Sequence, residues 1–490
     1  MLDTQYCYRA LQSRDARFDG KFFVGVSSTG IYCRPVCTAK TPVRPHCTFF
    51  PSAAAAEHAG FRPCLRCRPE LAPGNACVDA PRRIAHAAAS LIEDGFLEDS
   101  DLAALSDRLG CTDRHLRRVF QDEFGVSPVG YSQTQRLLLA KRLLTDTTLS
   151  VTDVAMASGF GSLRRFNALF QERYRMPPSR LRAGAKPATG NPPMRFELAY
   201  RPPLAWDTLL AFLGARAIAG VENVDGDAYR RTVALAHGGA QHRGWIEVRP
   251  TRRKSTLAVA VAPELAKVVP AVLARVKRLF DLACDPGVVE DVLGPLALRH
   301  AGLRVPGAFD GFEMAVRAVV GQQVTVKAAT TLSGRLAQAF GEPIATPWAP
   351  LTHTFPSAAR VAPLRVDDIA RHGIIASRAR SILALAAEID AGRITLAPGV
   401  DVDATIAALR EVPGIGDWTA QYVAMRGLAW PDAFPHTDLG VMKALGMTSP
   451  AKVLAAAERW RPWRAYAVMH LWHTLAGSEP RRRAHDIEKE

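Results

Sequence analysis

The chain has 490 residues, of which 48% are hydrophobic and 22% charged, and it carries a formal net charge of +15. This length exceeds what one hydrophobic core organises, so we expect about two to four domains. No apolar run approaches the ~20 residues of a membrane helix, and the first residues do not resemble a secretion signal. These features argue against a membrane or exported protein, and we expect a cytoplasmic monomer with no membrane partner.

The positive charge favours a polyanionic partner, because Lys and Arg near phosphates release condensed counterions. A generally basic surface would give the same charge, so the charge by itself favours nucleic acid only weakly. The nine cysteines are more typical of metal binding or catalysis than of disulfides, given no export signal.

Two stretches rich in Ala, Gly and Pro, at 70–81 and 182–193, are typical of linkers. We therefore predict a multidomain chain: a small α+β domain rich in cysteine, an all-α domain, and an α+β module in two parts. The predicted bounds of these four parts are 1–78, 82–183, 194–290 and 291–478.

The first domain contains two cysteine pairs, in "CRPVC" at 33–37 and "CLRC" at 64–67. Two such pairs supply the four sulfurs that tetrahedral zinc prefers, so the spacing predicts a zinc site. Zinc would also stabilise a short domain with few aliphatic residues, and on spacing alone a purely structural zinc is the favoured interpretation.

The second domain contains an internal repeat, in which Phe120-Gln121 recurs as Phe170-Gln171, 50 residues later. Each copy follows a short apolar helix and a turn at Gly110 or Gly159, which is typical of a helix-turn-helix. Each second helix is expected to bury one apolar stripe. The stripes are Leu116, Val119, Phe120 and Phe124 in the first copy and Leu163, Phe166 and Phe170 in the second.

Basic residues on the other faces of these two helices can reach phosphates and guanine edges in the major groove. A solvated charged face is the alternative, but two copies in a basic chain favour DNA binding. The candidate DNA-binding residues are Arg114, Arg117, Arg118, Arg164 and Arg165.

The stretches "FFVGVSSTGIYCRPVC" and "CTFFPSAAAAEHAGFRPCLRC", followed by the helix-turn-helix pair, resemble the amino-terminal half of the Ada family over about residues 3–182. In that family a zinc-bound cysteine accepts methyl groups from DNA phosphotriesters. The resemblance implies that Cys33 is the methyl acceptor and a zinc ligand, with Cys37, Cys64 and Cys67 as the other ligands. The second domain is similar to AraC-type DNA-binding domains.

From Met194 the chain has strand-like runs at 194–201, 244–250 and 256–263 and then becomes helical, which predicts an α+β module. Within it "PGIG" at 413–416 predicts a hairpin between two helices, whose amide groups suit a DNA phosphate. A tight turn between core helices would require Gly414 and Gly416 equally well.

Further along, Asp438 precedes an apolar helix, a place where aspartate is most often an N-cap. Together with "FEMAVRAVVGQQVTVKAA" and "RPWRAYAVMHLWHT", this region resembles the helix-hairpin-helix DNA glycosylases, most closely those of the AlkA type that act on 3-methyladenine. The resemblance covers Met194 to about Gly477 and implies that Asp438 is the catalytic carboxylate.

The resemblance also implies that Trp418, Tyr422 and Trp472 line the base pocket, although core packing is an alternative for each of these aromatic residues. Gln323 takes the place of an often apolar wedge that fills the vacated base stack. Relatives that also cut the strand place a lysine where this chain has Trp418, so the resemblance implies a monofunctional enzyme without a Schiff base.

We interpret the whole chain as a DNA alkylation repair and response protein with zinc as its cofactor. It would take methyl groups from phosphotriesters, activate transcription with RNA polymerase as a partner, and excise alkylated purines. Its DNA partners would be alkylated and promoter double-stranded DNA. The alternative is a transcriptional regulator whose glycosylase-like half only binds DNA, and release of free bases from methylated DNA distinguishes the two.

Overall fold

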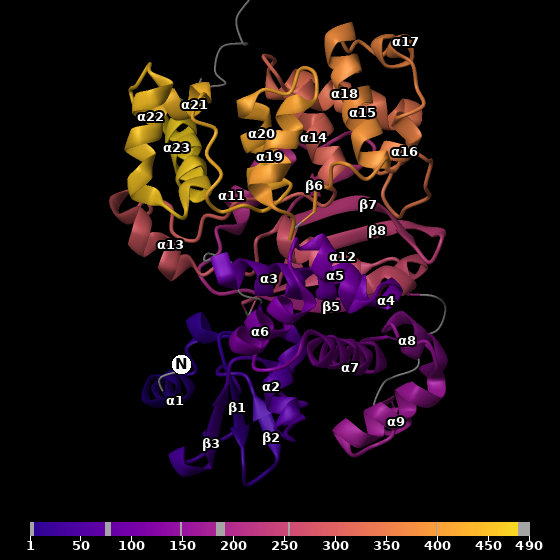
Figure 1. The fold of residues 1–490 in the computed structure, drawn as a ribbon, viewed down its shortest axis with the longest axis vertical. Helices are drawn as coiled ribbons and strands as arrows, with labels where there is room; N and C mark the ends of the chain where they lie inside the picture. The colour runs from indigo at the N-terminus through magenta and orange to yellow at the C-terminus, as the bar shows by residue number, and fades with distance from the viewer. Residues whose placement is uncertain are drawn as a thin grey trace, which may run out of the picture.

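The structure is a computed structural model. It describes residues 4–73, 80–147, 149–182, 192–252, 255–397 and 399–478. Figure 1 shows the amino-terminal part of the chain at one end of the longest axis, the carboxy-terminal helices at the other end, and a sheet between them. Most of the two predicted linkers lies outside the described residues, as does the predicted end of the first domain at residue 78. The predicted domain boundaries stay predictions.

The first unit is built on a sheet of four strands in the order β3-β1-β2-β4. β1 pairs antiparallel with β2 and β3, and β4 runs parallel to β2. Gly25 is required in β1, because a Cβ there would lie 2.8 Å from the Phe50 ring and 2.9 Å from the Phe61 ring. The elements are α1 Thr4–Ser13, β1 Phe23–Val26, β2 Ile31–Cys33, β3 Cys47–Phe50, α2 Ala53–His58, β4 Arg62–Pro63 and the short helix η3 Pro69–Leu71.

The second unit is all helical and contains the two predicted helix-turn-helix copies, α5 with α6 and α8 with α9. Gly110 and Gly159 have φ of 63° and 75° in the two turns, as a tight turn requires. Thr112 and Ser162 cap α6 and α9 through their hydroxyl groups. The helices are α3 Ala80–Glu93, α4 Phe96–Asp99, α5 Leu102–Arg108, α6 Asp113–Phe124, α7 Pro128–Asp146, α8 Val151–Ala157, α9 Leu163–Tyr174 and α10 Pro178–Arg182.

The predicted apolar stripe of the first copy is confirmed, since its four members are all buried. In the second copy Phe166 and Phe170 are buried, whereas Leu163 is only half-buried. The repeat in the sequence therefore corresponds to a repeat of packing.

The third unit contains an antiparallel sheet in the order β5-β9-β8-β7-β6. The three runs that indicated strands form β5, β8 and β9. The pattern missed β7, which buries Arg230 and Arg231 beside its apolar residues. The elements are β5 Met194–Ala199, α11 Trp206–Gly214, β6 Glu222–Asp225, β7 Ala228–His237, β8 Ala240–Pro250, β9 Thr256–Val261, the short helix η4 Pro263–Val268 and α12 Val269–Leu279.

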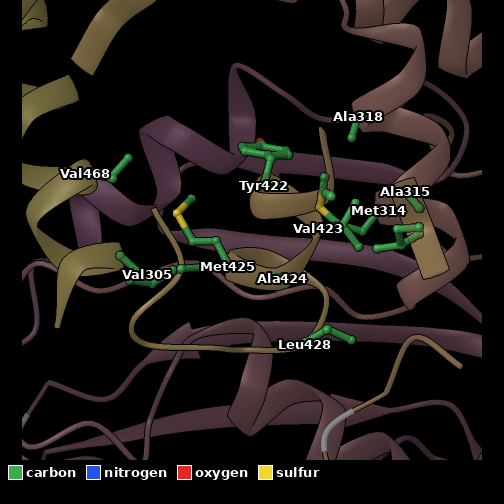
Figure 2. Close-up of a cluster of buried hydrophobic side chains, with 14 of the residues drawn as sticks. Val305, Met314, Ala315, Ala318, Tyr422, Val423, Ala424, Met425, Leu428 and Val468 are labelled. Carbon is green, nitrogen blue, oxygen red and sulfur yellow. The ribbon is translucent and has the colours of Figure 1, made fainter. Parts of the chain in front are cut away.

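The remaining elements are helices packed around α14, α20 and α23. Figure 2 shows the centre of this core, where Val423 of α20 lies near Met314 of α14 and Met425 extends toward Val305. The helices are α13 Pro286–Leu293, α14 Gly311–Val320, α15 Val326–Phe340, α16 Ala358–Val361, α17 Val366–Ala370, α18 Ala376–Asp390, α19 Val402–Glu411, α20 Asp417–Arg426, α21 Leu439–Ala444, α22 Pro450–Ala457 and α23 Arg464–Ser478.

Residues 4–182 and residues 192–478 share one hydrophobic core; after the families that they resemble in sequence, they are named here the regulator half and the glycosylase half. Leu143 and Phe170 belong to the same buried cluster as Met194 and Phe196. Among the described helices, none combines the length and the apolar character needed to cross a membrane.

Candidate functional site

The structure brings together the four cysteines that the spacing predicted. Cys33 ends β2, Cys37 follows in the next turn, and Cys64 and Cys67 lie in the loop after β4. Their sulfur atoms all lie within 4.8 Å of one another. A tetrahedral zinc with Zn–S bonds of about 2.3 Å sets its sulfurs about 3.8 Å apart, so the cluster fits this ion after a small contraction.

Backbone and arginine contacts hold the cysteine loops in place. The Arg34 amide donates to Cys67 Sγ at 3.3 Å, and Arg34 Nη1 donates to the Cys67 carbonyl at 3.0 Å. The buried Arg34 guanidinium also pairs with Asp19. Burial by itself lowers the pKa of Arg34, but Asp19 outweighs burial and raises it. Arg34 therefore stays charged and ties the two cysteine loops together.

Cys33 differs from the other three sulfurs in its surroundings. Cys37 and Cys64 are buried, and their sulfurs accept hydrogen bonds from the backbone amides of Ala39 and Cys67. Cys33 is half-buried, and among the described residues no backbone amide is found on its sulfur. Hydrogen bonding to the Cys37 thiol raises the pKa of Cys33, so a nearby cation is needed to keep it as a thiolate.

The five candidate arginines of the helix-turn-helix copies are all exposed. Arg114, Arg117 and Arg118 lie on α6, and Arg164 and Arg165 begin α9. Because the apolar stripes face inward, the basic residues of both helices are available to a partner outside the protein.

In the glycosylase half Asp438 is the N-cap of α21, as its place in the sequence suggested, and it is also held by two tryptophans. Its Oδ1 accepts from the Val441 amide at 2.9 Å and from Trp472 Nε1 at 2.8 Å. Its Oδ2 accepts from Trp418 Nε1 at 2.9 Å. The three donors fix the orientation of the carboxylate.

The predicted pocket aromatics surround this carboxylate. The rings of Trp418 and Tyr422 stack at 5.2 Å with an interplanar angle of 7°. Tyr422 and Trp472 lie 6.2 Å apart at 49°. Tyr422 also belongs to the buried core, so core packing and a position beside the carboxylate site are compatible for this residue.

The hydroxyl of Tyr422 is bound by an arginine side chain. Arg426 Nη1 donates to Tyr422 Oη at 2.9 Å. Burial by itself raises the pKa of Tyr422, but the guanidinium groups of Arg426 and Arg216 outweigh burial and hold this pKa below its usual value. The ring face, rather than the hydroxyl, is thus left to contact a base.

The hairpin between α19 and α20 leaves Gly414 and Gly416 exposed. Gly414 has φ of 82°, and a Cβ there would meet Ser381 Oγ at 2.2 Å, so glycine is required. Gln322 Nε2 donates to the Gly414 carbonyl and to Thr419 Oγ1, both at 2.9 Å. Its neighbour Gln323 is exposed at the surface with φ of 53°.

Two features of this site have no signal in the sequence motifs. Phe212 of α11 stacks on Trp472 at 6.4 Å and 13°, and Arg216 covers the Phe212 ring at 3.7 Å. Gly440 lets Trp472 approach the carboxylate, because a Cβ there would lie 3.0 Å from Asp438 Oδ1 and 3.1 Å from the indole. The only sequence signal for the second feature is Gly440 itself, which lies two residues after Asp438.

A cavity of about 600 Å³ lies away from Asp438, which is not among its lining residues. It lies between the two halves and is lined by residues of α3 and α12 and by the segments next to α19 and α20. We place the chemistry at Asp438 because the fixed carboxylate and the aromatic rings are there.

Family models match four consecutive parts of the chain. They are the metal binding domain of Ada at residues 6–70, a helix-turn-helix domain at 105–184, the AlkA N-terminal domain at 195–310 and the HhH-GPD superfamily of base excision DNA repair proteins at 316–462.

Three curated relatives cover the whole chain or one of its halves. The Mycobacterium tuberculosis "Probable bifunctional transcriptional activator/DNA repair enzyme AlkA" is 38% identical over 96% of this chain and 97% of its own length. Escherichia coli "DNA-3-methyladenine glycosylase 2" is 36% identical over 57% of this chain and 97% of its own length. Bacillus subtilis "Bifunctional transcriptional activator/DNA repair enzyme AdaA" is 32% identical over 36% of this chain and 82% of its own length. The chain therefore belongs to the family of bifunctional transcriptional activator/DNA repair enzymes that join an Ada-type metal-binding domain to an AlkA-type module.

Proposed function

We propose that the chain accepts methyl groups from DNA phosphotriesters on Cys33, activates transcription in consequence, and excises alkylated purines as a monofunctional glycosylase. One observation carries the proposal: a single chain assembles both sets of residues. Four cysteine sulfurs lie within 4.8 Å of one another, and Asp438 accepts three hydrogen bonds beside a group of aromatic rings. The names of the relatives support both activities.

In the first activity Cys33 Sγ attacks the methyl carbon of a neutral phosphotriester. The S–C bond forms as the C–O bond breaks, and the electron pair stays on the phosphate oxygen, which leaves as a phosphodiester anion. Zinc, held by Cys33, Cys37, Cys64 and Cys67, supplies the charge that keeps the sulfurs deprotonated. Nothing in the site returns the thioether to a thiolate, so each chain accepts one methyl group.

Cys33 is the favoured nucleophile among the four ligands for two reasons. It is half-buried, as is Cys67, whereas Cys37 and Cys64 are buried. The other sulfurs also accept backbone hydrogen bonds, which stabilise their negative charge and lower their nucleophilicity.

Methylation changes the charge that the regulator half presents to DNA. Four thiolates and one dication sum to −2, and a thioether at Cys33 makes the sum −1. The repulsion between this site and the DNA backbone becomes weaker. The exposed arginines of α6 and α9 then hold promoter DNA more tightly, which is the basis of activation.

In the second activity an alkylated nucleotide leaves the stack, and its cationic purine enters among the aromatic rings. The centroids of Tyr422 and Trp472 are 6.2 Å apart. A base held between two rings needs about 6.8 Å, twice the base-stacking spacing of about 3.4 Å. Because the two rings are inclined at 49°, Trp472 has to rotate as well as move outward to admit a planar base.

As the C1′–N bond breaks, its electron pair leaves with the purine, which departs neutral, and the sugar gains positive charge. The carboxylate of Asp438, oriented by Trp418 and Trp472, stabilises this charge. Water then adds at C1′ and loses a proton to solvent. Trp418 provides no amine, so no Schiff base forms and the strand stays intact.

A single incubation tests both activities. Pure protein is mixed with duplex DNA carrying radiolabelled methyl groups, and the free purines and the label bound to protein are both measured. Cys33→Ala should lose the protein-bound label and still release purines. Cys47→Ala, at a buried cysteine of the same domain outside the cluster, should keep both activities.

Label on the Cys33→Ala protein would contradict the assignment of the acceptor. If the wild-type protein released no free purine while still binding the DNA, the alternative of a glycosylase-like half that only binds DNA would replace the second activity.

A further inference from the structure

The regulator and glycosylase halves are docked on each other by charged pairs as well as by their shared core. Arg278 of α12 pairs with Asp94, which follows α3, at 2.8 Å. Arg142 of α7 donates to the Glu197 carbonyl of β5 at 2.5 Å and covers the Phe196 ring at 4.8 Å. These contacts, added to the common core, give the two halves a fixed relative orientation.

In this orientation the hairpin between α19 and α20 points away from the regulator half. The segment that leads into α19 lines the cavity between the halves, where a Cβ on Gly399 would lie 3.3 Å from Ala87 of α3. Met425 and Leu428, at the end of α20, line the same cavity. Each helix has 10 residues and is therefore about 15 Å long.

The hairpin lies at the opposite ends of these two helices, next to Gly414 and Gly416. Figure 2 labels Tyr422 within α20 and Leu428 just beyond the carboxyl end of this helix. In Figure 1, α20 and α21 accordingly lie at the end of the molecule farthest from β1 and β2.

The second recognition helix, α9, lies on the other side of the regulator half from the hairpin. α3 packs on both α12 and α6, and α8 packs on both η4 and α9. α8 therefore lies between α9 and the glycosylase half, whereas Gly110 and Phe124, at the turn before α6 and at the end of α6, line the cavity between the halves. The five arginines of α6 and α9 are exposed, so the docked arrangement leaves them uncovered. Figure 1 shows α9 at the end of the molecule opposite α20.

Two cations of α12, between the two faces, are paired with carboxylates. Arg278 pairs with Asp94, and Lys277 lies 3.8 Å from Glu93. These side chains are neutralised within the junction, so they do not extend a basic track from one face to the other along which a single duplex could lie.

We propose that one docked chain holds two separate duplex segments at the same time, one on α6, α9 and the sulfur cluster and the other on the hairpin. This proposal rests on the proposed function, because it requires that each half bind DNA. It adds a further activity, the bridging of two DNA segments, so that a chain held at a promoter can still capture a lesion on another segment.

A bead assay with the full chain tests this proposal. One short duplex carrying methylphosphotriesters is fixed to beads, and a second, fluorescent duplex contains a stable analogue of an abasic site. The label should stay on the beads only when the chain and the fixed duplex are both present. Excess unlabelled abasic-analogue duplex should release the label but leave the chain on the beads. Mass photometry should find one chain with two duplexes.

A matched pair of variants identifies the regulator face. Arg164→Glu combined with Arg165→Glu should release chain and label together from the beads, whereas Arg195→Glu, at an exposed arginine of β5, should change neither.

The outcomes separate this proposal from the function on which it rests. If fluorescence anisotropy shows that each duplex binds the chain by itself but that one displaces the other, bridging is overturned and the proposed function stands. If one duplex does not bind even by itself, the proposed function of that half fails, and bridging fails with it.

Discussion

The sulfur cluster and the base-excision site differ in how their residues are spread along the chain. The four cysteines lie within residues 33–67 of one small unit. The aromatic pocket takes Phe212 from α11, Trp418 and Tyr422 from α20, and Trp472 from α23. Ligand bonds can hold a few short loops together, whereas a pocket made from separate helices depends on their packing. The first site therefore depends on its ion and the second on the core.

Removal of the zinc ion should have the largest effect, because it should disable the first site and leave the second site active. Chelation, or Cys64→Ala, is expected to remove up to about 10 kcal/mol of folding free energy from the first unit, because a structural zinc site supplies folding energy directly. Hydrogen exchange should show loss of protection in β1 and β2, and methyl uptake should be lost. Base release should persist, because the hairpin core contains none of the ligands.

Cys111→Ala serves as the control for this prediction, since Cys111 is a half-buried cysteine of the helical unit outside the cluster. An equal loss of base release after chelation would mean that the glycosylase half also needs the ion.

Asp438→Asn tests the second of the two sites, the one proposed for base excision. Asparagine still caps α21, because it is as good an N-cap as aspartate, but it carries no charge toward the sugar. Base release in single turnover should fall by about 100-fold or more, with unchanged binding to a duplex that contains an abasic analogue. Asp403→Asn, at an exposed aspartate of α19, should release bases normally. Wild-type rates in Asp438→Asn would remove this carboxylate from the mechanism.

The stability of the first unit also depends on Glu57, a buried carboxyl group that joins this unit to the helical unit. It accepts from Tyr32 at 3.0 Å and from Thr134 at 3.2 Å. Burial raises the pKa of Glu57 from 4.5 to about 7. The protonated form is thus favoured by folding, and its stabilisation is complete below about pH 4.5 and lost as pH rises through about 7. The loss amounts to about 3 kcal/mol.

Glu57→Gln keeps both hydrogen-bond partners and cannot ionise. Its melting temperature should therefore exceed that of the wild type increasingly as the pH is raised from about 5 to about 8. Glu172→Gln, at an exposed glutamate of α9, should follow the wild type. Parallel curves for Glu57→Gln and the wild type would show that Glu57 does not titrate in this range.

The smallest effect is expected at the contact between the halves. Arg278→Asp should weaken docking by about 1 kcal/mol, because the pair with Asp94 is partly exposed. Adding Asp94→Arg should restore the attraction with reversed charges. Limited proteolysis between the halves measures the effect, and equal cleavage of the single and double variants would show that this pair does not support docking.

The sequence was most informative where one short segment contains the whole signal. The cysteine spacing predicted the sulfur cluster, and the recurrence of Phe120 at Phe170 predicted two helix-turn-helix copies with their buried stripes. β7 was not recognised, since its buried Arg231 pairs with Glu313 of α14, a partner that lies far along the chain. Phe212 was missed for the same reason.

By itself, the sequence determined the cysteine set, the capping aspartate and the glycine turns, because these are local features whose chemistry does not depend on distant partners. Only the tertiary structure decided that Phe212 and Gly440 shape the space around Asp438, and that the hairpin and α9 lie at opposite ends of the molecule. Those relations follow from the packing of α11, α20, α23 and α3 into shared cores. Packing of this kind depends on the shapes of side chains that are distant in the chain, and no local pattern contains that information.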